Sequence, residues 1–357
     1  MKKNLILSLV VGILLSAGGL YLAFRNVPFD ELLSYFAVIN YWWLLPSFGL
    51  VMLSFIFRAL RWQIIVGSVS RIDFWSSFHP LMIAFMINCV LPGRIGELAR
   101  PVLLKKNEDV PFSTGLATVG AERAFDVSFL VLLFLIVISF VQIDPDIRIA
   151  FGKYQLTKST LETITGGLIR LCLVMIAGMI FVSVQATRNF IAQMILKVPL
   201  LLFFTGDTVK NRLTESLCKP LIRLMENFAS GFELIKSPLK ILKCTGLSVL
   251  IWAIAAFSYY VFALGCPGVS LSLIEMTAIM VIICMFIALP SVPGYWGLWE
   301  AGGMFAMMLF GVSPREAAGF TLANHALQIF PVIVIGIISA VLTGVNIWRT
   351  SYNPDSA

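Results

Sequence analysis

Long apolar blocks that are nearly free of charge constrain this chain more than any other feature. Most of them reach the roughly 20 residues that a helix needs to cross the hydrocarbon of a bilayer. A chain that is 59% apolar and only 13% charged also exceeds what a soluble fold can bury. The pattern predicts an all-α polytopic membrane protein with about six full spans. The blocks are Leu5–Phe24, Tyr41–Gly67, Val127–Ile143, Gly166–Val184, Thr245–Leu264, Leu271–Leu289 and Ala317–Val345.

The basic residues between these blocks predict the orientation, because basic loops stay cytoplasmic. Lys2 and Lys3 precede the first block, which we interpret as a retained span and not as a signal peptide. Residues 187–243 carry nine Lys and Arg side chains and are expected inside. We also assign the stretch after the second span to the cytoplasm, from Arg58, Arg61, Arg71, Lys105 and Lys106. Both termini are then cytoplasmic, in the plasma (inner) membrane.

The basic segment 187–243 contains apolar residues at steps of three and four, which indicate an amphipathic helix. They are Leu213, Leu217, Leu221, Leu224, Phe228, Phe232 and Ile235. Two interpretations stay open: the helix packs under the bundle, or it lies on anionic inner-leaflet lipids. The net charge of +7 is concentrated in such loops, so it does not indicate a nucleic acid partner. A homo-oligomer is compatible with the pattern.

Two broken segments interrupt the apolar pattern. Leu81–Leu91, between His79-Pro80 and Pro92-Gly93, is too short to cross, and Leu271–Leu289 is followed by a second Pro-Gly turn. Counting spans, the two enter from opposite faces as re-entrant or broken hairpins. Both turns read Pro-Gly-x-x-Gly, with the residues Pro92, Gly93, Gly96, Pro293, Gly294 and Gly297.

The spacing of ionisable residues after the two turns also matches. Glu97 precedes Glu122 by 25 residues, and Glu300 precedes His325 by 25 residues. Together with the opposed orientation, this predicts an inverted repeat within a single transmembrane domain, residues 1–357. The approximate halves are 41–186 and 244–347, joined by the basic segment 187–243.

The turns predict a polar site inside the membrane. Pro and Gly leave backbone groups unpaired, and the free N–H groups at the start of a helix suit an anion such as phosphate. Buried charges are costly and face the bundle interior. The candidate substrate-binding residues are Arg94, Glu97, Arg100, Glu122, Arg123, Asp126, Glu300 and His325. Alternatively, pairs such as Arg94 with Glu97 only hold helices together, and His325 is only a structural residue.

Three motifs carry a resemblance to a known family. They are Leu91-Pro92-Gly93-Arg94-Ile95-Gly96-Glu97-Leu98-Ala99-Arg100, Gly120-Ala121-Glu122-Arg123-Ala124-Phe125-Asp126 and Pro293-Gly294-Tyr295-Trp296-Gly297-Leu298-Trp299-Glu300. The chain resembles the flippase-like family named for the transmembrane region of lysylphosphatidylglycerol synthases, over nearly its whole length. The resemblance implies a stand-alone membrane domain, without a synthase domain, that moves anionic or glycosylated lipids between leaflets.

The function we expect is therefore transport of a lipid with a phosphate-bearing headgroup, anionic or glycosylated and polyprenyl-linked forms included, through an intramembrane polar cavity. We expect no enzyme activity, no cofactor and no metal site. Two alternatives stay open: an intramembrane lipid-phosphate enzyme resembling a polyprenyl-pyrophosphatase, and an ion-coupled transporter of a small solute. The enzyme would need a nucleophile or base near the phosphate, whereas Pro92-Gly93 is followed by Arg94.

Overall fold

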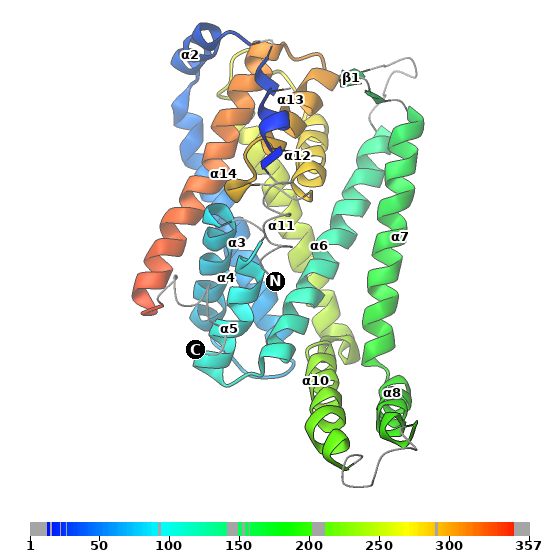
Figure 1. Ribbon diagram of the computed structural model, residues 1–357. Coiled ribbons are helices and arrows are strands. Elements are labelled where there is room, and N and C mark those ends of the chain that lie inside the picture. The colour runs from blue at the N-terminus through cyan, green and yellow to red at the C-terminus, as the bar shows by residue number, and fades with distance from the viewer. Residues whose placement is uncertain are drawn as a thin grey trace.

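The computed structural model shows one bundle of helices (Figure 1). The residues that it describes are 13–14, 16–21, 23–25, 27–91, 94–140, 149–151, 154–156, 158–201, 211–289 and 292–345. After helical residues between 13 and 24, the elements in chain order are α2 (Phe29–Val38), η1 (Tyr41–Trp43), α3 (Leu44–Val66), α4 (Phe74–Val90), α5 (Gly96–Glu108), α6 (Phe112–Phe140), β1 (Ile149–Phe151), β2 (Tyr154–Leu156), α7 (Lys158–Ser183), α8 (Gln185–Lys197), η2 (Val198–Leu201), η3 (Thr214–Cys218), α10 (Lys219–Ser230), η4 (Glu233–Lys236), α11 (Pro238–Ala263), α12 (Leu273–Ile287), η5 (Pro293–Tyr295), α13 (Leu298–Leu309) and α14 (Pro314–Leu342). The expected all-α class is confirmed, apart from the short antiparallel hairpin of β1 and β2.

Three helices in the described part of the chain are long and apolar enough to cross a membrane. They are Tyr41–Val66, Pro238–Ala263 and Pro314–Leu342. A fourth span is formed if the pair Ile176–Ser183 and Gln185–Lys197, bent by 75°, counts as one. α6, with 29 residues, also exceeds the length of about 20 residues that the hydrocarbon requires. The predicted number of about six full spans stays a prediction.

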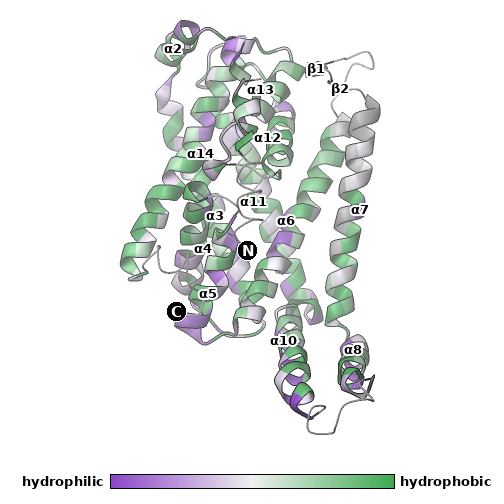
Figure 2. Cartoon of the chain, viewed as in Figure 1, coloured by the Kyte–Doolittle hydropathy of each residue, from purple (hydrophilic) through white to green (hydrophobic). Residues whose placement is uncertain are grey.

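The two ends of the bundle differ in polarity. α5, α8, α10 and the end of α14 lie at one end, and α2, α13 and the β-hairpin lie at the other (Figure 1). Hydrophilic residues gather on α5, α8 and α10, whereas α3 and α14 are mostly apolar along their lengths (Figure 2). The structure thus places Lys105, Lys106 and the basic α8–α10 segment at the same end, as the loop charges predict. That this end faces the cytoplasm stays a prediction.

The first broken segment begins earlier than predicted. α4 starts at Phe74 and continues through Pro80 to Val90, so it has 17 residues and not the 11 expected. Asp73 caps it by accepting a hydrogen bond from the Ser76 N–H at 2.6 Å. His79-Pro80 is therefore no boundary. At 1.5 Å per residue α4 is still shorter than the hydrocarbon core of about 30 Å.

Two sets of four helices pack around a shared centre. α3 packs along α11, α4 packs on α14, and α6 packs on α12. If α3–α6 correspond in order to α11–α14, then α4 is equivalent to α12 and α6 is equivalent to α14. The contact of α4 with α14 is then equivalent to the contact of α12 with α6. Each set also contains a short helix, a turn and a second short helix, namely α4–α5 and α12–α13. The boundary predicted at residue 244 falls within α11. The inverted repeat with halves 41–186 and 244–347 stays a prediction.

The amphipathic segment is helical over α10, and the two ends of this helix differ in how they pack. Near the end of α10, the Thr114 hydroxyl of α6 donates to the Asn227 carbonyl at 2.6 Å. At its beginning, Leu221 and Leu224 remain exposed. The end of α10 therefore packs beneath the bundle, as one of the two interpretations predicted. Contact of the exposed part with anionic lipid stays a prediction.

Candidate functional site

One turn of α6 places three charged side chains at the centre of the bundle. Glu122 is completely buried and is bonded to Arg61 and Arg123, each at 3.3 Å, and to Arg100. Asp126, one turn later, contacts Arg61 at 2.6 Å and Arg123 at 3.2 Å. An unpaired buried charge costs several kcal/mol, so these groups are stable only as a network.

Two members of this network were assigned wrongly from the sequence. Arg58 and Arg61 lie within α3 and not in a cytoplasmic loop. Arg61 is completely buried, and its Nη1 also donates to Ser248 Oγ of α11 at 2.8 Å. Arg58 Nη1 lies 3.5 Å from Asp126. The signal was their position inside the apolar block Tyr41–Gly67, at a spacing that places both on one helix face.

The network has more positive than negative charge. Arg58, Arg61, Arg100 and Arg123 face three carboxylates, those of Glu97, Glu122 and Asp126. Glu97 is the outermost, with its Oε2 3.9 Å from Arg123 Nε and its side chain 25% exposed. Among the residues that the structure describes, each of these carboxylates therefore contacts an arginine, and one positive charge remains in excess.

Arg100 keeps unused donors in this buried position. Its guanidinium lies over the Trp62 ring at 4.1 Å, and its side chain is 1% exposed. Nη2 binds Glu122, but Nε and Nη1 have no partner among the described residues. A planar guanidinium with free N–H groups suits an anion with several oxygens, such as a phosphate. Excess charge and free donors thus point to the same ligand chemistry.

At the first turn, Arg94 and Glu97 do not form the ion pair that was considered as a contact holding helices together. Arg94 has a φ of 54° and its Nη2 donates to the Ile287 carbonyl at 2.6 Å, at the end of α12. Glu97 faces Arg123 instead of Arg94. Gly96 is required by packing: its N–H donates to Asn88 Oδ1 at 2.9 Å, and a Cβ there would lie 2.0 Å from the Ala84 carbonyl oxygen. Pro92 and Gly93 lie outside the described residues.

The second turn is held by Glu300 and His325. Gly294 and Gly297 have φ angles of 69° and 89°, which favour glycine. Gly297 N–H donates to Glu300 Oε2 at 2.6 Å, and His325 Nε2 donates to the Gly294 carbonyl at 2.8 Å. His325 Nδ1 lies 2.5 Å from Glu300 Oε1. Both ring nitrogens of His325 thus face oxygen acceptors, one on the turn and one on Glu300, and the imidazole joins the two.

The 25-residue spacing therefore has different outcomes in the two halves. Glu300 and His325 bond directly, and both are completely buried. Glu97 and Glu122 do not bond to each other, but each contacts Arg123. His325 is also stacked on Trp299, with ring centroids 4.5 Å apart and planes at 4°. This environment favours the structural interpretation of His325, and its proposed substrate contact stays a prediction.

The two turns meet. The guanidinium of Arg94 lies 5.8 Å from the centre of the Tyr295 ring, and an added Cβ on Gly294 would lie 3.2 Å from the Cys89 carbonyl oxygen. The structure thus joins Glu97, Arg100, Glu122, Arg123 and Asp126 in one cluster, with Arg94 between that cluster and the second turn. Glu300 and His325 form a separate group behind the turn.

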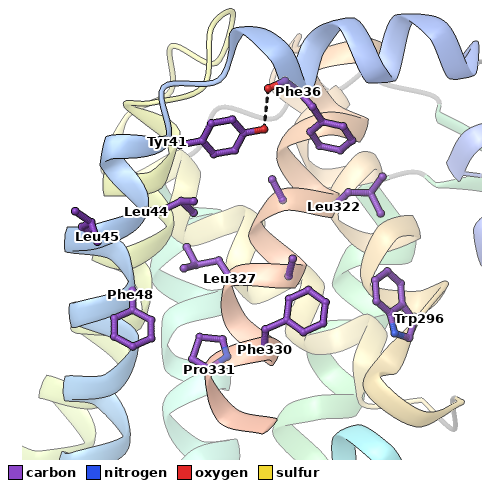
Figure 3. Close-up of a pocket in the computed structure, with 12 residues that line it drawn as sticks. Phe36, Tyr41, Leu44, Leu45, Phe48, Trp296, Leu322, Leu327, Phe330 and Pro331 are labelled. Carbon is purple, nitrogen blue, oxygen red and sulfur yellow. Dashed lines mark hydrogen bonds between the residues drawn. The ribbon is translucent and has the colours of Figure 1, made fainter. Parts of the chain in front are cut away.

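An apolar groove of about 640 Å³ lies on the other side of the second turn. Its walls come from the beginning of α3 and the middle of α14, with Trp296 at one end (Figure 3). The Tyr41 hydroxyl, bonded to the Phe36 carbonyl at 2.7 Å, closes another part of it. Leu45 and Phe330 on the rim are 64% and 58% exposed. Both helices that form its walls, α3 and α14, are candidate membrane spans.

Comparison with known proteins places the chain in a family. The model of the lysylphosphatidylglycerol synthase TM region matches residues 9–336. The chain belongs to this family. No curated protein and no solved structure matches the chain.

The match to the lysylphosphatidylglycerol synthase TM family includes all the described residues of the site. The matched residues run from before α2 into α14 and so include both turns, the arginine cluster and the Glu300–His325 pair. The family indicates a membrane protein with a lipid-related function. The resemblance that the three motifs suggested is thereby confirmed.

Proposed function

We propose that the protein moves a phosphate-bearing lipid between the leaflets of the membrane. The observation that carries this proposal is the buried arginine cluster, which has one positive charge in excess and two free donors on Arg100. A phosphate group would neutralise the excess charge and would accept hydrogen bonds from the two donors. The cluster then lowers the cost of bringing a headgroup into the hydrocarbon, which is the main barrier to lipid exchange.

The groove beside Trp296 supports a lipid over a small soluble solute. A lipid transporter has to shelter the headgroup while the hydrocarbon chains stay in lipid. The turn 293–297 has Tyr295 facing Arg94 and Trp296 facing the groove. A headgroup at the cluster and a chain in the groove would therefore lie on opposite sides of one turn. This arrangement accounts for both features with a single substrate.

Alternating exposure of the cluster would follow from the two four-helix sets. We propose that they are inverted repeats, that α4–α5 and α12–α13 are re-entrant hairpins from opposite faces, and that one set rocks against the other. The Arg94 bond to Ile287 and its contact with Tyr295 cross between the sets. Both have to change when the sets move.

Purified protein in proteoliposomes tests the proposal by the leaflet exchange of a fluorescent phospholipid. Arg100→Gln removes the free donors and leaves Glu122 bonded to Arg61 and Arg123. We expect exchange to fall by about 10-fold to 100-fold, which corresponds to one or two charge-assisted hydrogen bonds. Arg71→Gln, at an exposed position outside the cluster, is the matched control.

Three results would contradict the proposal. Exchange by a folded Arg100→Gln protein at the wild-type rate would remove the role of the cluster. Release of phosphate from the lipid, without exchange, would instead favour the intramembrane enzyme. Uptake of a soluble solute without lipid exchange would favour the ion-coupled transporter.

A further inference from the structure

The two turns each carry a side chain at a position where the backbone favours glycine. Arg94 follows Pro92-Gly93 and has a φ of 54°, and Tyr295 follows Pro293-Gly294 and has a φ of 62°. Left-handed backbone is strained for residues other than glycine, because Cβ approaches neighbouring backbone atoms. Such strain gathers at functional sites. Both turns thus keep a side chain at this position although it costs stability.

The two strained residues face each other beside the arginine cluster. The guanidinium of Arg94 lies 5.8 Å from the centre of the Tyr295 ring. The hydroxyl of Tyr295 also interacts electrostatically with Glu97 and Arg123. The side chains of Glu97 and Arg123 are 25% and 31% exposed, whereas that of Arg100 is 1% exposed. The pair therefore lies beside the accessible part of the cluster.

Arg94 is a cation without a carboxylate partner among the described residues. Its Nη2 donates to the Ile287 carbonyl at 2.6 Å, and its side chain is exposed. Apolar side chains close to it in the chain are exposed as well: Leu98 is 46% exposed, and Leu289, two positions after Ile287, is 50% exposed. A charge in apolar surroundings is costly unless it is paired. Arg94 therefore calls for an anion from outside the protein.

Tyr295 supplies a neutral donor at the same place. Its side chain is half-buried, and its hydroxyl makes no hydrogen bond to the described residues. Phosphate oxygens accept hydrogen bonds from both a guanidinium and a phenol. A cationic ligand is disfavoured, because Arg94 repels it and Glu97 already contacts Arg123. The two side chains together match a phosphate.

We propose that Arg94 and Tyr295 form the entrance site of the arginine cluster, where the phosphate binds before it reaches Arg100. This inference rests on the proposed function and adds a substrate-binding residue, Tyr295, that the sequence reading did not select. A phosphate between the two side chains separates Arg94 from the Tyr295 ring. Binding at the entrance thus weakens a contact between the two four-helix sets that has to change during transport.

Glycine substitutions test whether these side chains are kept for function. Tyr295→Gly and Arg94→Gly relieve the left-handed strain, as does the control Asp109→Gly, where φ is 54° at the exposed end of α5. We expect exchange of fluorescent phosphatidic acid in proteoliposomes to fall about tenfold in the first two and to stay within about twofold in the control. The melting temperature of the control should stay within about 3 °C of the wild type. A tenfold loss of exchange in the control would overturn the argument from strain.

Tyr295→Phe isolates the hydroxyl. It keeps the ring beside Arg94, so its melting temperature in dodecyl maltoside, a detergent without phosphate, should stay within about 3 °C of the wild type. Dioleoylphosphatidic acid titrated into this detergent should stabilise both proteins. The variant should need about tenfold more lipid for half of the effect, as expected for the loss of one hydrogen bond to a charged group. Tyr260→Phe, at a half-buried tyrosine stacked on Phe257 of α11, is the matched control and should keep the wild-type midpoint.

The dependence on lipid fraction separates the entrance from the deeper site. Exchange by Tyr295→Phe should be slow at low fractions of phosphatidic acid and should recover at high fractions, whereas Arg100→Gln should be slow at both. An unchanged midpoint in folded Tyr295→Phe, or a loss of exchange that is equal at all lipid fractions, overturns the entrance site. If the wild type exchanges no lipid, the proposed transport fails, while the titration in detergent still decides whether Tyr295 binds phosphate.

Discussion

Arg61 should be the most important residue of the cluster for stability. It bonds to Asp126 at 2.6 Å, to Glu122 at 3.3 Å and to Ser248 at 2.8 Å, and is completely buried. Removing one partner of a buried ion pair costs about 3–5 kcal/mol. Because Asp126 keeps Arg123 at 3.2 Å and Arg58 at 3.5 Å, we expect Arg61→Met to cost about 3 kcal/mol, at the lower end of this range.

Reversible unfolding by sodium dodecyl sulfate in bicelles, followed by circular dichroism, measures this cost. Arg71→Met, at an exposed position, should lie within about 0.5 kcal/mol of the wild type. In the double variant with Asp126→Asn, the two losses should not add, and their coupling should be at least about 1 kcal/mol. Additive losses, or an Arg61→Met loss below about 1 kcal/mol, would refute the idea that the carboxylates depend on Arg61.

Three further predictions concern the turns and the basic segment. Gly96→Ala should lower the yield of folded protein in size-exclusion chromatography, because its Cβ would lie 2.0 Å from a carbonyl oxygen, whereas Gly49→Ala, in open space, should not. His325→Phe removes the bonds to Glu300 Oε1 and to the Gly294 carbonyl, so hydrogen exchange at residues 293–297 should become faster; unchanged exchange contradicts the role of His325 in holding this turn. Replacing exposed Lys197 and Arg223 by Gln should reduce the retention of anionic over zwitterionic lipid in native mass spectrometry, by about 1 kcal/mol for each charge, and equal retention contradicts lipid contact.

The sequence predicted which residues form the arginine cluster better than it predicted the ion pairs among them. Glu122, Arg123 and Asp126 stand within five positions on one helix, so their common location follows from helical geometry. Which arginine meets which carboxylate depends on how α3, α5 and α6 pack. The Arg94–Glu97 pair, left open as an alternative, does not form for that reason: α12 offers Arg94 a carbonyl from 193 residues away.

The polar residues of α14 show the same limit. Thr321, Asn324 and Gln328 are ordinary residues in a helix sequence, and nothing local says whether they face lipid, water or another helix. Only the packing of the helices around α14 shows that Thr321 and Asn324 are buried without a hydrogen-bond partner among the described residues. The boundary of α4 was misjudged because Pro80 was taken to mark its beginning, whereas the helix starts at Phe74 and continues through this proline.

The sequence by itself determined that this protein belongs in a membrane and where its helices are interrupted. Charge-free blocks cannot be stable in water, and Pro-Gly turns cannot continue a helix, whatever surrounds them. The tertiary structure decided which charges are paired, which donors are left free, and that the two turns meet across Arg94 and Tyr295. Those outcomes depend on distances between residues far apart in the chain, and only the packing of the helices fixes such distances.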